Sequence, residues 1–190
     1  PQHRRQRQMC IRDRIKGILR GIIVIVLLMG GAAQAQPITE EEIEQAQKAW
    51  AEGIVAIGAA YLNSGNYQGL AAEHVDTLYG YDEGTVLFKP TKASSVQFRL
   101  TEEEALSYFV GGIVSEDTGF ALQPWSMVRF ENVDIITDND SAVAMGNYYF
   151  KDAKTGKVVK VEYTFGYVRG ADGNLLINVH HSALPYKPTD

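Results

Sequence analysis

The chain has 190 residues, of which 45% are hydrophobic, a formal net charge of -5 and a single cysteine, Cys10. Residues 36–190 carry 11 Lys and Arg against 22 Asp and Glu, so they would repel a nucleic-acid backbone, and nucleic-acid binding is excluded. Because Cys10 lies before it, this part has no disulfide, no thiolate nucleophile and no cysteine-ligated metal site. Its length and composition predict one domain over residues 36–190.

The first 35 residues are typical of a leader. An apolar run over residues 21–29 follows Lys16 and Arg20 and precedes Ala33-Gln34-Ala35, the order found in a secretory signal peptide. Cleavage is expected after Ala35, which would place the mature protein in the periplasm or outside the cell and leave it without a membrane association. A retained membrane anchor is the alternative, although the run is short for a membrane span.

The segment before the apolar run has an unusual composition. Residues 6–14 read QRQMCIRDR, which looks like translated adapter sequence. We therefore interpret residues 1–35 as a non-native flank plus a signal peptide. A basic RNA-binding arm is the functional alternative.

Three helices are predicted before the four long strands. Thr39 and Glu42 form a capping box, and a stripe of apolar residues from Ile43 to Tyr61 follows, with Gly65 as the expected stop. Residues 67–79 predict a shorter helix. A second capping box begins a third helix at Thr101, which is expected to run to Val110.

The second half of the chain predicts mostly strands. A short strand over 85–88 should end before Pro90, and four further strands are expected over residues 127–136, 141–150, 157–168 and 175–183, separated by turns. The order predicts an α+β fold in which the N-terminal helices pack on the concave face of a curved antiparallel sheet.

Side-chain alternation in the last strand identifies candidate site residues. Asn178, His180 and Ser182 should share one face, while His181 and Ala183 share the other. This polar row forms a site if it faces a hollow covered by the helices, and an ordinary outer surface if it faces solvent. The sequence leaves both alternatives open.

The histidines of residues 36–190 argue against a metal site ligated by three histidines. Residues 36–190 contain only His74, His180 and His181, and neighbouring strand histidines cannot both reach one ion without a bulge. Sites assisted by carboxylates stay open. His74, on a predicted helix, is more readily explained as a core or surface residue than as a ligand.

Three segments resemble the iota-class carbonic anhydrases. They read Val-Leu-Phe-Lys-Pro-Thr over residues 86–91, Ala-Leu-Ser-Tyr-Phe over 105–109 and Val-His-His-Ser-Ala-Leu-Pro over 179–185. The resemblance extends from about Glu42 to Tyr186. The family usually has a second serine where Ala183 stands, and alternation predicts that this change affects packing rather than a ligand.

The resemblance implies a fold, a reaction and an assembly. The fold is the cone of the nuclear-transport-factor-2-like superfamily, which includes SnoaL-like proteins and the association domain of calcium/calmodulin-dependent kinase II. The reaction is the reversible hydration of CO₂ to bicarbonate, and the assembly is a homodimer. No essential metal is expected, although zinc or manganese is left open. In the metal-free form, Thr91, Tyr108 and Ser182 would hold bicarbonate.

These residues suggest a mechanism. Hydroxyl groups can donate to or accept from CO₂, water and bicarbonate, and Phe88 and Phe109 could form an apolar wall. The hypothesis gives His180 the role of base or proton shuttle. The competing class is a non-catalytic ligand-binding or oligomerisation module, since cone folds serve both purposes.

Overall fold

The structure, a computed structural model, describes residues 36–188. The predicted non-native flank, the signal peptide and its cleavage after Ala35 concern residues outside this range, apart from the new terminus at Gln36. Among the described residues, no helix is both long enough and apolar enough to cross a membrane.

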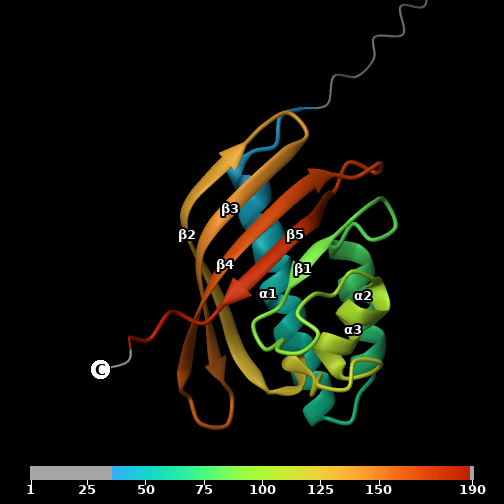
Figure 1. The fold of residues 1–190 in the computed structure, drawn as a ribbon, viewed down its shortest axis with the longest axis vertical. Helices are drawn as coiled ribbons and strands as arrows, with labels where there is room; N and C mark the ends of the chain where they lie inside the picture. Colours follow the sequence, from blue (N-terminus) through green and yellow to red (C-terminus); the bar gives the residue numbers. More distant parts are fainter. Residues whose placement is uncertain (1–35, 189–190) are drawn as a thin grey trace, which may run out of the picture. The chain divides into compact units, whose positions relative to one another are not determined.

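Two helices come first along the chain, a short strand and a third helix follow, and four long strands come last, in the predicted order (Figure 1). The elements in chain order are α1 (Glu40–Leu62), α2 (Tyr67–Leu78), β1 (Leu87–Lys89), α3 (Glu102–Val110), the short 3-10 helix η1 (Phe120–Leu122), β2 (Trp125–Thr137), β3 (Ser141–Asp152), β4 (Val158–Arg169) and β5 (Leu175–Ala183).

The helix starts are confirmed, whereas one predicted helix end is wrong. Thr39 and Thr101 each accept a hydrogen bond from the amide three residues later, and each forms a complete capping box. The first helix ends at Leu62 rather than just before Gly65. Ser64 there takes the left-handed conformation, with a φ of 55°, that was expected of the glycine.

The sheet has five strands in the order β1-β5-β4-β3-β2. The four long strands form the predicted antiparallel meander. Strand β1 adds to the free edge of β5 in parallel, so the sheet is mixed rather than wholly antiparallel. A parallel pair is allowed here because helix α3 and three strands separate β1 from β5 in the chain.

Two features bend the long strands around the helices. Strand β2 has an extra residue at Val133, where the register with β3 shifts between Asn132 and Asp134. Opposite this bulge lies Gly146, and a Cβ atom there would come within 2.1 Å of the Glu131 carbonyl oxygen. Bulges and glycines of this kind increase twist and curvature, which creates the concave face that the helices cover.

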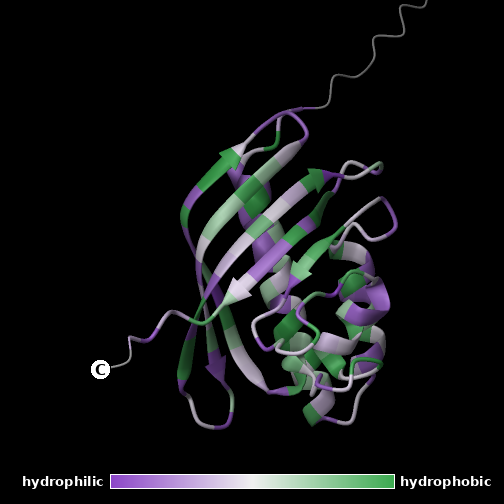
Figure 2. Ribbon diagram, viewed as in Figure 1, coloured by the Kyte–Doolittle hydropathy of each residue, from purple (hydrophilic) through white to green (hydrophobic). Residues whose placement is uncertain are grey.

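One face of the sheet is packed against the helices. Along β3, buried Ala142, Ala144 and Tyr148 alternate with exposed Val143 and Met145. Helix α1 crosses the buried face of the sheet (Figure 1). Its Trp50 is 1% exposed and belongs to the hydrophobic core. Figure 2 shows that the second half of β5 is nevertheless hydrophilic. A polar stretch in a packed sheet indicates a site.

Candidate functional site

The last strand directs one histidine and one serine inward. His180 is 2% exposed and Ser182 is 1% exposed, whereas His181 between them is exposed. This confirms the alternation predicted from the sequence and decides the question that the sequence left open. The imidazole and the hydroxyl lie on the helix-covered face.

The predicted polar row is wrong at Asn178. Strand β4 pairs Gly166 with Val179 and Tyr167 with Ile177, so Asn178 is an extra residue in β5. A Cβ atom on Gly166, which lies on the outer face, would come within 2.8 Å of the Asn178 carboxamide oxygen. The bulge therefore shifts Asn178 to the outer face, and the inward polar pair begins at His180.

Thr91 reaches this pair because of the parallel strand pairing. Phe88 in β1 is opposite His180 in β5, and the chain continues from β1 through Pro90 to Thr91. The Thr91 hydroxyl donates to the Ser182 hydroxyl over 3.0 Å. Thr91 is half-buried, so the two hydroxyls lie where the core meets solvent.

Tyr108 extends from α3 to the same place. Its hydroxyl accepts a hydrogen bond from the Lys92 amide at 3.4 Å, and the side chain is 5% exposed. Burial raises the pKa of Tyr108, while hydrogen bonds from the Lys92 backbone and the Thr91 side chain oppose that rise. The structure thus brings together Thr91, Tyr108 and Ser182, as the resemblance implied.

Two tyrosines that the sequence did not single out complete the site. The Tyr79 hydroxyl lies 2.8 Å from His180 Nδ1, and the Tyr148 hydroxyl lies 3.4 Å from His180 Nε2. Burial raises the pKa of Tyr148, and hydrogen bonds with Ser182 and Thr91 oppose that rise. Tyr148 therefore joins the histidine to the hydroxyl pair. As an inward tyrosine of a central strand, it gave no signal that distinguished it from a core residue.

The His180 ring is enclosed by aromatic side chains. Phe88 stacks on it with a centroid distance of 4.4 Å and an interplanar angle of 15°, and the Phe165 centroid lies 4.1 Å away. Burial lowers the pKa of His180 well below its ordinary value, and the nearby His181 and His74 lower it further. The ring is therefore neutral at physiological pH.

The two phenylalanines predicted to form an apolar wall are both fully buried. The Phe88 ring lies between the rings of His180 and Tyr108. It stacks on His180 and makes an edge contact with Tyr108, with a centroid distance of 5.6 Å. Phe109 stacks on Phe88 at 5.9 Å. Phe88 thus borders the site directly, and Phe109 supports it.

His74 lies in the core, one of the two placements, core or surface, that the sequence favoured over a metal ligand. The side chain is 6% exposed and packs against Trp50 and Phe109, and burial lowers its pKa to about 3. Across residues 36–188, no three His, Cys, Asp or Glu side chains gather closely enough to hold a metal ion.

A buried ion pair fixes the loop that follows Thr91. The Arg99 guanidinium donates to the Asp117 carboxylate at 2.5 and 3.2 Å, and the two side chains are 0% and 1% exposed. The Arg99 amide also donates to the Phe88 carbonyl over 2.8 Å. Both ends of the loop over residues 90–98 are therefore tied to the core, which holds Thr91 near Ser182.

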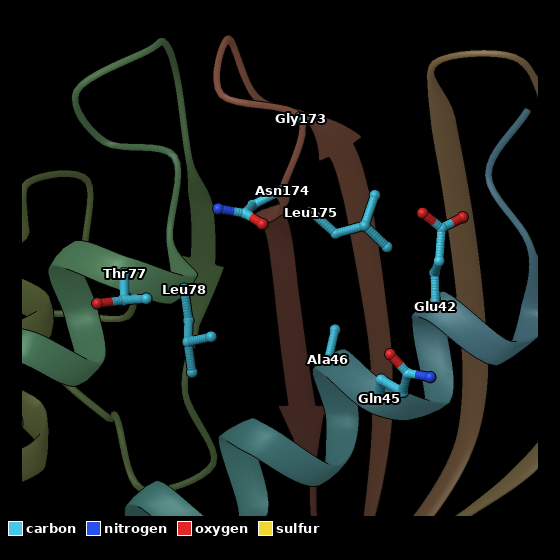
Figure 3. A pocket seen from close by; sticks show the side chains of 8 residues that line it. All are labelled: Glu42, Gln45, Ala46, Thr77, Leu78, Gly173, Asn174 and Leu175. Atoms are coloured by element: carbon cyan, nitrogen blue, oxygen red, sulfur yellow. The ribbon is translucent and has the colours of Figure 1, made fainter. Parts of the chain in front are cut away.

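A separate pocket of about 330 Å³ lies between α1, the end of α2 and the β4–β5 turn (Figure 3). Its lining is Glu42, Gln45, Ala46, Thr77, Leu78, Gly173, Asn174 and Leu175. These residues come from helices, a turn and the start of β5, and the hydroxyl cluster of Thr91, Tyr108, Tyr148 and Ser182 is not among them. The pocket therefore contributes nothing to the chemistry of the candidate site.

The comparison with solved structures agrees with this architecture. An iota-carbonic anhydrase from a cyanobacterium, solved in complex with bicarbonate, is 43% identical and covers 80% of this chain and 95% of its own, with a TM-score of 0.77. A calcium/calmodulin-dependent protein kinase type II association domain from Thiobacillus denitrificans ATCC 25259 is 11% identical, with a TM-score of 0.52, and covers 75% of this chain and 94% of its own. The second likeness shows the cone fold alone.

Sequence comparisons identify the family. A metal-independent carbonic anhydrase of Nostoc sp. (strain PCC 7120 / SAG 25.82 / UTEX 2576) is 44% identical over 155 residues, which are 79% of this chain and 75% of the relative. The family model described as metal-independent carbonic anhydrase matches residues 41–184. That range includes every member of the hydroxyl cluster. The chain therefore belongs to the metal-independent, iota-class carbonic anhydrases.

Proposed function

We propose that this chain catalyses the reversible hydration of CO₂ to bicarbonate at the hydroxyl cluster, defined as Thr91, Tyr108, Tyr148 and Ser182. The observation that carries the assignment is the contact of 3.0 Å between the Thr91 and Ser182 hydroxyls. The chain that contains this contact belongs to the metal-independent carbonic anhydrases, and the cyanobacterial relative was solved in complex with bicarbonate.

The reaction requires groups that can stabilise the negative charge that develops on the oxygens of CO₂. In the forward direction, a water oxygen forms a bond to the carbon of CO₂, one C=O bond becomes a C–O single bond, and one water proton leaves. Negative charge develops on the CO₂ oxygens, and hydroxyl donors aimed at them stabilise the transition state. Because each hydroxyl can also accept, the same cluster can orient the attacking water.

The surroundings of the cluster suit both reactant and product. Phe88 gives linear, apolar CO₂ a surface without competing hydrogen bonds. Lys89 donates to the Ser182 carbonyl over 3.1 Å, and Lys92 follows Thr91 directly. Two cationic side chains at this edge of an otherwise acidic domain favour the approach of an anion such as bicarbonate.

The role of base or shuttle for His180 stays a prediction. Its low pKa makes the neutral ring a poor acceptor of a water proton, and both ring nitrogens face tyrosine hydroxyls. These surroundings favour a role in positioning. The released proton then leaves toward solvent on the side of half-buried Thr91.

A stopped-flow assay of CO₂ hydration tests the proposal. The chain over residues 36–190 is expected to accelerate hydration, and to do so equally before and after treatment with a metal chelator. Orientation and hydroxyl donors must then supply the whole rate, each tenfold corresponding to about 1.36 kcal/mol of barrier. Absence of acceleration above buffer would reject the proposed function, and loss of acceleration with the chelator would reject its metal independence.

We also propose that two copies associate through the outer face of the sheet. Exposed apolar side chains gather there from neighbouring strands, among them Val143 and Met145 of β3 and Ile136 of β2. An apolar sheet face of this kind favours burial against a second copy. Sedimentation of the chain, with Met145→Glu as the disrupting variant, distinguishes a dimer from a monomer.

We propose in addition that the protein is exported. The support is the order of the leader, with Lys16 and Arg20 before the apolar run and Ala33-Gln34-Ala35 after it. Amino-terminal sequencing of secreted or periplasmic protein is expected to begin at Gln36. A chain that keeps its leader and sediments with membranes would contradict the proposal.

A further inference from the structure

A line of buried hydrogen bonds begins at Trp50. The Trp50 indole N–H lies 2.9 Å from the Tyr79 hydroxyl, and the two side chains are 1% and 2% exposed. An indole nitrogen can only donate a hydrogen bond. The direction of this first bond is therefore fixed, and the Tyr79 oxygen accepts.

Because the Tyr79 oxygen accepts from Trp50, the Tyr79 hydroxyl must donate its own hydrogen bond to His180. Its hydroxyl has one proton, and His180 Nδ1 lies 2.8 Å away. In a buried site a hydroxyl proton without an acceptor carries a large energetic cost. The Tyr79 proton is thus donated to Nδ1, which must be the unprotonated nitrogen of the ring.

The other ring nitrogen then carries the proton. Because burial keeps His180 neutral, a proton-free Nδ1 means that Nε2 is protonated and faces the Tyr148 hydroxyl, 3.4 Å away. The opposite tautomer would make Tyr79 accept from both Trp50 and His180, and the Tyr79 proton would have no partner. The Nε2–H tautomer is the one that satisfies every group in the line.

The line ends at the hydroxyl cluster. With its oxygen accepting from His180, Tyr148 keeps its own proton for the neighbouring hydroxyl pair of Ser182 and Thr91, which oppose the rise of the Tyr148 pKa. Thr91 donates to Ser182. Whichever of the two accepts from Tyr148, the proton of Ser182 is left for an oxygen of the bound ligand.

We propose that Tyr79, oriented by Trp50, is a positioning residue that holds His180 as the Nε2–H tautomer and so makes Tyr148 a donor to the Thr91–Ser182 pair. The proposal rests on the proposed function for its effect on rate, and on hydrogen-bond geometry and the burial of the His180 ring for the tautomer. His180 acts in it by holding Tyr148 rather than by removing a proton from water.

The tautomer can be measured in the unaltered protein. In the full chain labelled with ¹⁵N-histidine, long-range ¹H–¹⁵N correlation spectra distinguish a protonated from an unprotonated ring nitrogen. The His180 ring is expected to show Nε2 protonated and Nδ1 unprotonated. An Nδ1–H tautomer in the wild-type chain would overturn the proposal, and this measurement needs no variant that could fail to fold.

A matched pair of variants tests the role of Tyr79. Tyr79→Phe removes the donor to Nδ1, so the preference for one tautomer should be lost and kcat for CO₂ hydration should fall about tenfold, with a smaller change in KM. Tyr163→Phe removes an equally buried hydroxyl whose partners are Gln47 and Asn132 rather than His180. It should keep the Nε2–H tautomer and the wild-type kcat.

The outcomes separate the inference from the proposed function. A Tyr79→Phe chain that retains the single Nε2–H tautomer would overturn the role of Tyr79, whatever its activity. A wild-type chain with the expected tautomer but no CO₂ hydration would reject the proposed function and leave the hydrogen-bond assignment standing. A drop in kcat with the expected change of tautomer would support both.

Discussion

The Thr91 hydroxyl donates to the Ser182 hydroxyl over 3.0 Å, although 91 positions separate the two residues in the chain. The contact exists because Phe88 and His180 are partners in the parallel pair of β1 and β5. A slip of one residue in that pair would turn the inward side chains of β1 to the opposite face. The register of a three-residue strand therefore determines whether the site exists.

Removal of either hydroxyl of this contact tests the site most directly. Thr91→Ala and Ser182→Ala are each expected to lower kcat/KM for CO₂ hydration by about 10²-fold, since each removes a donor aimed at developing charge. Thr91→Ser retains a hydroxyl and should keep most of the activity. Stopped-flow kinetics measures the rates and circular dichroism checks the fold. Near-wild-type turnover in both alanine variants would refute the assignment.

Tyr148 and its neighbour in sequence provide a matched comparison. Tyr148→Phe removes the hydroxyl between His180 and the cluster, and we expect a loss of about 10²-fold in kcat. Tyr149→Phe changes the same residue type on the outer face, where the ring lies under the Arg129 guanidinium at 4.4 Å. Stopped-flow rates should be unchanged in the second variant. Equal losses in the two would contradict a specific role for Tyr148.

The ion pair of Arg99 and Asp117 should stabilise the fold. Asp117→Asn leaves the fully buried guanidinium with only the more distant Glu116 carboxylate, at 4.0 Å, as a counter-charge, and we expect the free energy of unfolding to fall by about 3 kcal/mol. Urea unfolding followed by fluorescence measures the change. The exposed pair of Lys48 and Glu52, whose side chains are 74% and 69% exposed, is the control. Lys48→Ala should change stability by less than about 0.5 kcal/mol.

Two buried histidines make the fold sensitive to acid. Burial lowers the pKa of His180 well below 6.5 and that of His74 to about 3, so both are neutral when folded and become protonated on unfolding once the pH falls below 6.5. The unfolded chain then binds more protons, and stability should fall by up to about 1.4 kcal/mol per pH unit for each histidine.

Urea unfolding between pH 7.5 and 4.5 measures this slope. Glu116 and Asp152, whose pKa values are lowered from 4.5 and 3.8 to about 2 by hydrogen bonds, lose their contribution to stability mainly below the lower end of this window. His74→Gln should remove one histidine's share of the slope. A stability that does not change over this window would show that the two rings can be protonated in the folded state.

The sequence predicted those parts of the fold that depend on local patterns. Capping boxes at Thr39 and Thr101 marked two helix starts correctly, and alternation placed His180 and Ser182 together. Such patterns depend on residues within a few positions of one another. The end of the first helix was missed because a serine, Ser64, adopts a conformation usually taken by glycine.

The missed features depend on contacts between distant segments. Nothing near Asn178 signals the bulge that turns it outward, since the bulge arises from the register with β4. Tyr79 and Tyr148 belong to the site because strand pairing and helix packing bring their hydroxyls to one imidazole. Their sequence context is that of core tyrosines, so only the assembled structure could identify them.

The parallel edge pair also has a consequence for the order of folding. Strand β5 is the last strand of the described residues and is the one with which β1 pairs, so Thr91 cannot meet Ser182 before β5 has joined the sheet. Contacts between such distant parts of a chain form slowly, because a long loop must close first. The helices and strands β2 to β4 can assemble earlier, and the catalytic cluster is completed only when β5 has paired with both β4 and β1.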